Sequence, residues 1–236
     1  MRARLRRPSL RGINPIVGPS SVSLIPFPLI FDGSSLKVRA MKTILPTFLA
    51  LVASAAAAAG PMTPGDRQRL VAHLEMTEAW LESEVHGLSD AQLKFKMTPD
   101  SWSVEEVVMH LAIAEPQYWD QFKESLAKPV KPGFKPQVTD AQMLWYGIDR
   151  TQRTTTGDAR VPRNQFPSMN ASLASFKKLR VELMKTAKES QEDLRGGQSL
   201  TASQDLYQWF LMISTHSQRH IMQIREVKAH KNYPKK

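Results

Sequence analysis

The amino-acid sequence predicts an all-α fold, a four-helix bundle with a long crossover connection between its second and third helices. Four long segments repeat apolar residues at the three- to four-residue spacing of a helix. No segment alternates apolar and polar residues for the length of a strand. One extended connection separates the second and third helical segments, and bundles of this kind build ligand sites from side chains that face one another in the interior.

The first helix is expected to run from Pro64 to about His86. Thr63 provides an N-terminal cap, Pro64 suits the first helical position, and Gly87 ends the helix. The face that we expect to be buried carries Leu70, Leu74, Thr77, Leu81 and Val85.

The second helix is expected over about 104–127. Ser103 and Glu106 have the spacing of a capping box, and Trp102 before the cap suits a hydrophobic staple with Val107. Pro116 predicts a kink in this helix. Its apolar stripe consists of Val104, Val107, Val108, Leu111, Ala114, Tyr118 and Phe122.

The connection after the second helix begins with an irregular segment over 128–136, which holds three prolines and one glycine. A short helix is expected over 139–150, and a polar loop then leads to Pro167. The whole stretch forms the predicted crossover.

The third long helix is expected over 170–194, because Gly196 and Gly197 then stop it. The fourth is expected over 203–229. The third helix has an apolar stripe of Leu173, Phe176, Leu179, Leu183 and Ala187, and the fourth has one of Leu206, Trp209, Phe210, Ile213, Ile224 and Val227.

The N-terminal region has the features of an export signal. Residues 41–60 combine a basic start, an apolar run and small residues that fit a cleavage site near 57–59. Residues 1–40 are rich in Arg, Pro and Ser, and we expect a disordered extension upstream of the true start at Met41. The alternative is a basic tail before a single membrane anchor. We expect a periplasmic or secreted protein with no stable membrane span after cleavage, and a mature domain over 61–236.

The formal net charge of +10 does not indicate a nucleic-acid partner. Residues 1–60 carry eight Lys or Arg against one acid, so the remaining residues carry a net charge of only +3. No basic stripe interleaved with aromatic residues is present there. The chain has no cysteine, which excludes disulfides, thiolate zinc sites and a cysteine nucleophile and leaves imidazole and carboxylate as metal ligands.

His216 and His220 are the most informative residues of the chain. Residues four apart on a helix share a face, so the two imidazoles can converge on one metal ion. The apolar stripe of the fourth helix passes through both positions, so both are expected to face the core. The alternative is a pair of core histidines bonded to backbone or hydroxyl groups, because buried ring nitrogens need partners.

His110 lies along the edge of the apolar stripe of the second helix, one turn from Val107 and Ala114. One imidazole from this helix and two from the fourth would form a site of three histidines.

The segments WSVEEVVMHLAIAE (102–115) and THSQRHIMQI (215–224) resemble the DinB superfamily, also called DinB/YfiT-like. The resemblance covers about 63–234. It implies a four-helix bundle with a metal held by one His of the second helix and two of the last, which fall on His110, His216 and His220.

The resemblance implies a metal-dependent enzyme of the hydrolase or thiol S-transferase type, acting on an unknown small molecule. Three protein ligands leave an open coordination position, as in catalytic sites. The divalent metal is expected to be zinc, with nickel as the alternative. The competing classes are a non-enzymatic periplasmic metal- or ligand-binding bundle and a helical interaction domain with a vestigial site. The catalytic base is unassigned, and a homodimer is left open.

The other histidines have expected roles outside this site. His86 and His230 lie in last helical turns, where a partial positive charge suits the helix dipole, and both are expected to be structural. His73 is expected to be a solvated or hydrogen-bonded helix residue.

Four further polar or aromatic residues have two interpretations each. Glu115 could support a ligand, but a position about 140° around the helix from His110 favours an exposed carboxylate. Gln223 could orient a ligand, but an interhelical hydrogen bond is favoured. Trp119 or Trp145 could line a pocket mouth, although aromatic residues at helical spacing more often pack in a core.

Overall fold

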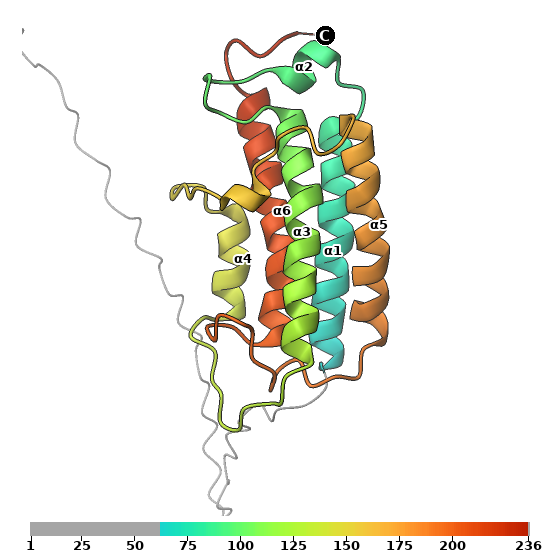
Figure 1. Cartoon of the computed structure of the whole chain (residues 1–236), viewed down its shortest axis with the longest axis vertical. Coiled ribbons are helices and arrows are strands. Elements are labelled where there is room, and N and C mark those ends of the chain that lie inside the picture. Colours follow the sequence, from blue (N-terminus) through green and yellow to red (C-terminus); the bar gives the residue numbers. More distant parts are fainter. Residues whose placement is uncertain (1–61, 236) are drawn as a thin grey trace, which may run out of the picture. The chain divides into compact units, whose positions relative to one another are not determined.

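The computed structural model describes residues 62–235. The expected extension over 1–40 and the expected signal peptide over 41–60 lie outside the described residues. The described part contains helices and no strand (Figure 1), namely α1 (Pro64–Val85), α2 (Asp90–Lys94), α3 (Val104–Leu126), α4 (Asp140–Ile148), the 3-10 turn η1 (Asp158–Arg160), α5 (Met169–Glu189) and α6 (Leu206–Lys228).

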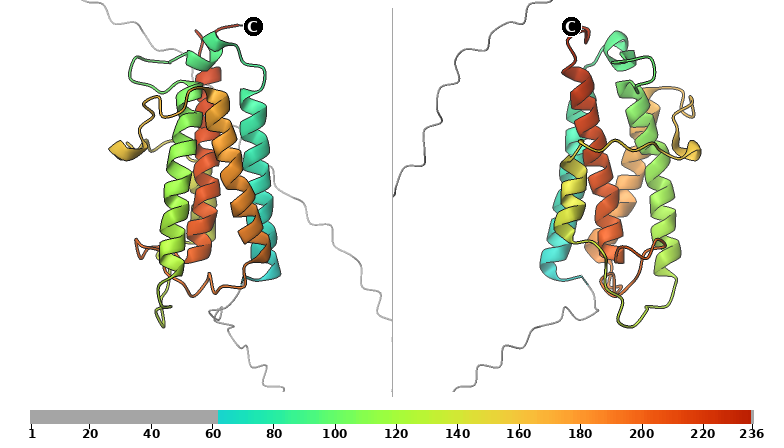
Figure 2. Two further views of the ribbon diagram at one scale, coloured as in Figure 1. Left: turned by 45° about the vertical axis from the view of Figure 1, so that its right-hand side comes forward. Right: turned by 90° about the vertical axis from the view of Figure 1, so that its left-hand side faces the viewer.

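Helices α1, α3, α5 and α6 form the predicted four-helix bundle. Helix α6 packs against α1 and α3, and α5 packs against the same two helices from the other side. Helices α1 and α6 run in one direction and α3 and α5 in the other (Figures 1 and 2). Because α3 and α5 are parallel, the chain must return along the bundle between them, and residues 127–168 form this crossover.

Helix α4 lies within the crossover and packs against the outer side of α6. The two helices are parallel, since Asp140 at the start of α4 accepts a hydrogen bond from Gln208 and Gly147 near its end lies against Thr215. A Cβ on Gly147 would lie 3.0 Å from the Thr215 carbonyl oxygen, so a larger residue would push the two helices apart.

Short polar side chains fix where the helices begin. Ser103 accepts a hydrogen bond from the backbone N–H of Glu106, whose carboxylate accepts one from the Ser103 N–H, so the predicted capping box of α3 is present. Asp205 and Gln208 form the same box in α6. The fourth helix therefore begins at Leu206 and not at residue 203, because Asp205 caps it. Helix α3 continues through Pro116.

The third helix ends earlier than its sequence predicts. Helix α5 stops at Glu189, not at residue 194. Arg67 of α1 donates hydrogen bonds of 2.7 Å to the carbonyl oxygens of Ala187 and Ser190. In a continuing helix these oxygens would accept hydrogen bonds from backbone N–H groups four residues later. Gly197 has another role, because a Cβ there would collide with Leu206. The five-residue helix α2 was not predicted, since it is too short to show a period.

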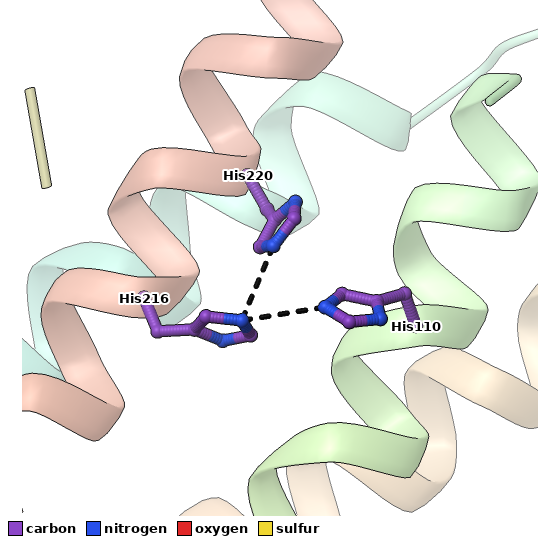
Figure 3. A group of neighbouring side chains, drawn as sticks. All are labelled: His110, His216 and His220. Carbon is purple, nitrogen blue, oxygen red and sulfur yellow. Dashed lines mark hydrogen bonds between the residues drawn. The ribbon is translucent and has the colours of Figure 1, made fainter. Parts of the chain in front are cut away.

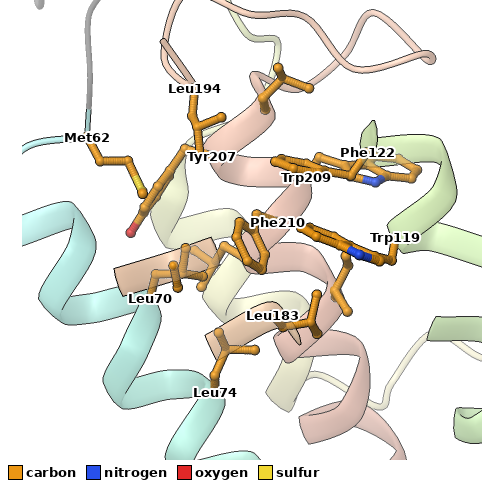
Figure 4. Packing of buried hydrophobic residues seen from close by; sticks show 14 of the residues in the cluster. Met62, Leu70, Leu74, Trp119, Phe122, Leu183, Leu194, Tyr207, Trp209 and Phe210 are labelled. Atoms are coloured by element: carbon orange, nitrogen blue, oxygen red, sulfur yellow. The ribbon is translucent and has the colours of Figure 1, made fainter. Parts of the chain in front are cut away.

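Two apolar clusters fill the bundle, and the predicted stripe of α1 is buried throughout. In the cluster near the start of α6, Trp119 stacks on Phe122 with ring centroids 4.6 Å apart, and both contact Phe210 (Figure 4). The second cluster joins the other ends of α1, α3 and α6 through Leu81, Val85, Val107, Ile221 and Ile224. None of the described helices is long and apolar enough to cross a membrane.

Arg195, in the loop before α6, ties the starts of three helices together. Its guanidinium contacts Asp66 of α1 at 2.6 Å, Asp140 of α4 at 2.8 Å and the cap residue Asp205 at 3.1 Å. Burial raises the pKa of Asp66, but hydrogen bonds from Arg195 and Thr63 outweigh burial and lower that pKa from 3.8 to about 2.

Replacing Asp66 with Asn should flatten the pH dependence of stability in acid. A lowered carboxyl pKa stabilises the fold above the unfolded value near 4, and this contribution of about 2 kcal/mol is lost as the pH falls toward 2. Urea unfolding at pH 7 and at pH 2.5 measures it. The difference between wild type and Asp66→Asn should shrink at the lower pH, and a constant difference would contradict the assignment.

Candidate metal centre

Three histidines from two helices bring their Nε2 atoms together in the interior (Figure 3). His110 projects from α3, and His216 and His220 project from successive turns of α6. Nε2 of His216 lies 3.3 Å from Nε2 of His110 and 3.2 Å from Nε2 of His220. The expected proximity of the three residues is therefore present, and within the described part of the chain they form the single group with metal-ligand geometry.

Acceptors behind two of the rings fix their orientation and their protons. Nδ1 of His110 lies 2.8 Å from the carbonyl oxygen of Arg160, in the turn η1. Nδ1 of His220 lies 2.9 Å from Oε1 of Gln223, one turn along α6. Because oxygens of this kind only accept, the ring protons sit on Nδ1, and the lone pairs of both Nε2 atoms point at the centre. Gln223 thus orients an imidazole, and the expected interhelical hydrogen bond is wrong.

Hydrogen bonds within the protein cannot satisfy all three Nε2 atoms. His110 and His220 both present lone pairs to His216, and a single proton on Nε2 of His216 serves one of them. Such a proton would also leave Nδ1 of His216 as a buried acceptor without a donor. A cation among the three nitrogens would accept all three lone pairs. Tetrahedral ligands at about 2.0–2.1 Å from zinc lie about 3.3–3.4 Å apart, so the residues fit a metal.

The environment keeps the imidazoles neutral, as metal ligands must be. Burial lowers the pKa of His110 and lowers the pKa of His216 and of His220 well below the usual value of 6.5. The neighbouring imidazoles act in the same direction on His216 and His220. At neutral pH the Nε2 lone pairs of His110 and His220 are therefore free of protons.

A buried ion pair lies behind His216. Arg180 of α5 contacts Oε2 of Glu115 at 3.0 Å, and Ser217 donates a short hydrogen bond to the same carboxylate. Oε1 of Glu115 lies 3.9 Å from Nδ1 of His216, and its negative charge favours a proton at that nitrogen. Burial raises the pKa of Glu115, while the charge of Arg180 opposes the rise.

The sequence-based expectation of an exposed Glu115 is wrong, since its side chain is 0% exposed. The position about 140° from His110 is correct for a helix, but α5 covers that face of α3 in the bundle.

A cavity of about 580 Å³ opens over the three histidines. Its wall contains Trp102, whose ring centroid lies 4.7 Å from that of His110, and Tyr118, which meets His216 edge-on at 5.1 Å. The tryptophans considered for this role do not line it: Trp119 is packed in the core and Trp145 is 62% exposed on α4. From the sequence, Trp102 was expected to form a hydrophobic staple at the start of α3 and Tyr118 to belong to the apolar stripe of that helix.

The remaining histidines lie outside the cluster. His73 is hydrogen-bonded to Ser214 at 2.7 Å and to Gln218 at 3.2 Å, in agreement with one of its two expected roles. His86 is the C-terminal cap of α1, and His230 follows the end of α6.

The fold and the cluster define a helical bundle with three histidines in its interior, one from α3 and two from α6. The sequence profile of the DinB superfamily matches residues 69–224, and the chain belongs to this superfamily.

The chain is also similar to two individual proteins, one in sequence and one in fold. The uncharacterized protein YuaE of Bacillus subtilis (strain 168) is 27% identical over 155 residues, which are 64% of this chain and 91% of YuaE. The solved structure of YfiT from Bacillus subtilis is similar with a TM-score of 0.50 and 20% identity, covering 73% of this chain and 91% of that one. YfiT is described as "a probable metal-dependent hydrolase with an unusual four-helix bundle topology". At this identity the likeness shows the fold alone.

Replacing Glu115 with Ala should lower the free energy of unfolding by about 3–5 kcal/mol, because Arg180 would remain as an unpaired buried cation. The double variant Glu115→Leu/Arg180→Met should recover most of the loss. As a matched control, Glu124→Ala, also on α3, removes an exposed ion pair with Lys128 just beyond the helix and should cost under about 1 kcal/mol. Urea denaturation of the metal-free proteins measures all three, and equal costs for Glu115→Ala and Glu124→Ala would refute the prediction.

Proposed function

We propose that His110, His216 and His220 hold a divalent metal ion and that the protein is a metal-dependent enzyme whose substrate enters the cavity above them. The observation that carries this proposal is the convergence of three Nε2 atoms that hydrogen bonds within the protein cannot satisfy together. Membership of the DinB superfamily and the fold shared with YfiT support it.

Neutral imidazole favours zinc, with nickel as the alternative. Bound there, the ion would lower the pKa of a water molecule or of a thiol substrate and so supply hydroxide or thiolate near neutral pH. This chemistry accommodates both reaction types inferred for the protein, a hydrolase and a thiol S-transferase. The chain has no cysteine of its own, so a thiol would have to arrive with the substrate.

The protein's own residues hold the ligands and shape the space beside them. The Arg160 carbonyl and Gln223 keep two rings in place, and Glu115 lies behind the third. Trp102 covers the rings of His110 and His220, with centroid distances of 4.7 and 6.2 Å. A cavity of about 580 Å³ has the volume of a small-molecule site, which favours an enzyme over a closed storage or structural site.

Removing one ligand tests the metal site. Protein purified without a His tag should bind about one zinc per chain, and His216→Ala or His220→Ala should abolish tight binding. Excess zinc at about 100 times the dissociation constant should stabilise the wild type by about 2.7 kcal/mol, a rise in Tm of roughly 5–10 °C, and leave the variants unchanged. Elemental analysis and thermal unfolding measure the two effects.

The matched control is His86→Ala at the exposed end of α1, which should bind zinc and respond to it like the wild type. Undiminished metal content in His216→Ala would refute the site. An activity screen with ester, amide and thiol substrates, with and without chelator, then separates an enzyme from a metal-binding bundle. Stoichiometric zinc without any chelator-sensitive turnover would favour the latter.

We also propose that the protein is exported, on the basis of the order of basic, apolar and small residues over 41–60. Expressed from Met41 in a Gram-negative host, the chain should be cleaved near Ala59 and recovered from the periplasm or the medium. Mass spectrometry of the mature protein measures the cleavage site. An intact N-terminus at Met1 in native protein would refute both the cleavage and the start at Met41.

A further inference from the structure

The cavity above the three histidines is lined by more cationic than anionic side chains. The charged residues of its wall are the arginines Arg150, Arg153, Arg160 and Arg219 and the acids Asp100 and Glu226. A cleft with an excess of one charge attracts ligands of the opposite charge. The excess exists before any metal charge is added.

Glu226 neutralises only part of this charge. Its carboxylate forms a two-point pair with Arg150, at 3.0 and 3.1 Å, and Arg153 lies 3.9 Å from one of the same oxygens. Arg219 has no carboxylate partner among the described residues. It is buried under the ring of Tyr146, and its terminal nitrogens donate to carbonyls at the end of α4 and in the following loop. Arg219 therefore adds charge to the cavity, but its terminal nitrogens are already occupied.

Arg160 is a cation of the wall that keeps free donors while its side chain is held in place. Its Nε donates to Gln117 at 3.1 Å, and its guanidinium lies 4.6 Å from the centroid of the Tyr118 ring. Its two terminal nitrogens have no hydrogen bond and no ion pair within the described residues, and they are not sealed from solvent. The guanidinium is thus held through Nε and stacked on the Tyr118 ring, and its two terminal nitrogens are free to donate hydrogen bonds.

The backbone of Arg160 places its guanidinium beside the histidines. The carbonyl of Arg160 accepts the hydrogen bond from Nδ1 of His110, so the residue is anchored to the cluster through its own main chain. The Tyr118 ring that supports the guanidinium also meets His216 edge-on. A molecule in contact with the three histidines therefore lies within reach of the Arg160 side chain.

We propose that Arg160 binds an oxyanion group, a carboxylate or a phosphate, of the small molecule that occupies the cavity. This inference rests on the proposed function only in taking that molecule to be the substrate. A planar guanidinium donates two parallel hydrogen bonds to either group, and a neutral ligand would leave the excess positive charge of the wall uncompensated. The substrate is then an anionic organic molecule. Its anionic group binds Arg160, and its reacting atom lies close to the three histidines.

The test uses simple probes because the substrate is not identified. Succinate, inorganic phosphate and neutral succinamide are titrated into the full mature chain at constant low ionic strength, and NMR shifts of the backbone amides of residues 160–161 and 118 report binding. Succinate, phosphate or both should bind and succinamide should not, and which of the two anions binds distinguishes the carboxylate from the phosphate.

The decisive variant is Arg160→Gln, which should weaken anion binding by about tenfold or more, as expected for loss of a charged hydrogen-bonding partner. Arg160→Lys keeps the charge without the planar guanidinium and should bind with intermediate strength. The matched control is Arg163→Gln, an exposed arginine three residues away that pairs with Asp158 and does not line the cavity. It should bind like the wild type.

Metal content, measured in every sample, separates this inference from the proposed function. Anion binding that depends on Arg160 in a chain that takes up no zinc when zinc is supplied would support the inference and refute the metal site. Stoichiometric zinc with no anion binding, or with equal binding by wild type and Arg160→Gln, would overturn the inference alone. If Arg160→Gln does not fold, as judged by circular dichroism, the comparison of Arg160→Lys with Arg163→Gln decides, and equal affinities overturn the proposal.

Discussion

The enclosure of α6 is the constraint on which the rest of the structure depends. Helix α1 packs on one side of it, α3 on another and α4 on a third, so that most of its residues are buried although its middle is polar. A buried polar group without a partner costs about 1–3 kcal/mol, so every such group on α6 needs one. Ser214 bonds with His73 and Thr77, Ser217 with Glu115, and Arg219 with carbonyls after α4. His216 and His220 face His110 instead.

The crossover follows from the same constraint. With α3 and α5 parallel, the chain must travel the length of the bundle between them, and it does so along the remaining open side of α6. This path places Gly147 against the α6 backbone and carries η1 to the mouth of the cavity, where Arg160 meets His110. A connection that satisfied the topology by a shorter route would leave Arg219 without its carbonyl partners and His110 without its acceptor.

The bundle and the pair His216 and His220 could be predicted because each depends on local spacing, whereas the inclusion of His110, 106 residues from His216, rested on the resemblance to the DinB superfamily. An apolar period marks a helix, and histidines four apart must share a face. The end of α5 and the burial of Glu115 could not be predicted, since Arg67 is distant in sequence from the carbonyls that it captures and the face of α3 that carries Glu115 is covered by another helix. Arg160 was missed for the same reason. Its position in a polar loop has no period, and only the packing of the crossover places it beside His110.

The polar groups around the histidines differ in what they require of a partner. The Glu115 carboxylate is compensated within the protein by Nη2 of Arg180 and by Ser217, and a bonded charge pair of this kind can be stable without any ligand, although Nε and Nη1 of Arg180 have no hydrogen-bond partner. The imidazoles cannot do so, because two of the three present acceptors only and the third has one proton to offer at either nitrogen. Hydrogen bonds within the protein therefore orient His110 and His220 through Nδ1 and leave the converging Nε2 atoms incompletely satisfied. An arrangement that costs stability in the free protein, and that a single cation would relieve, is what separates a binding centre from a set of core histidines.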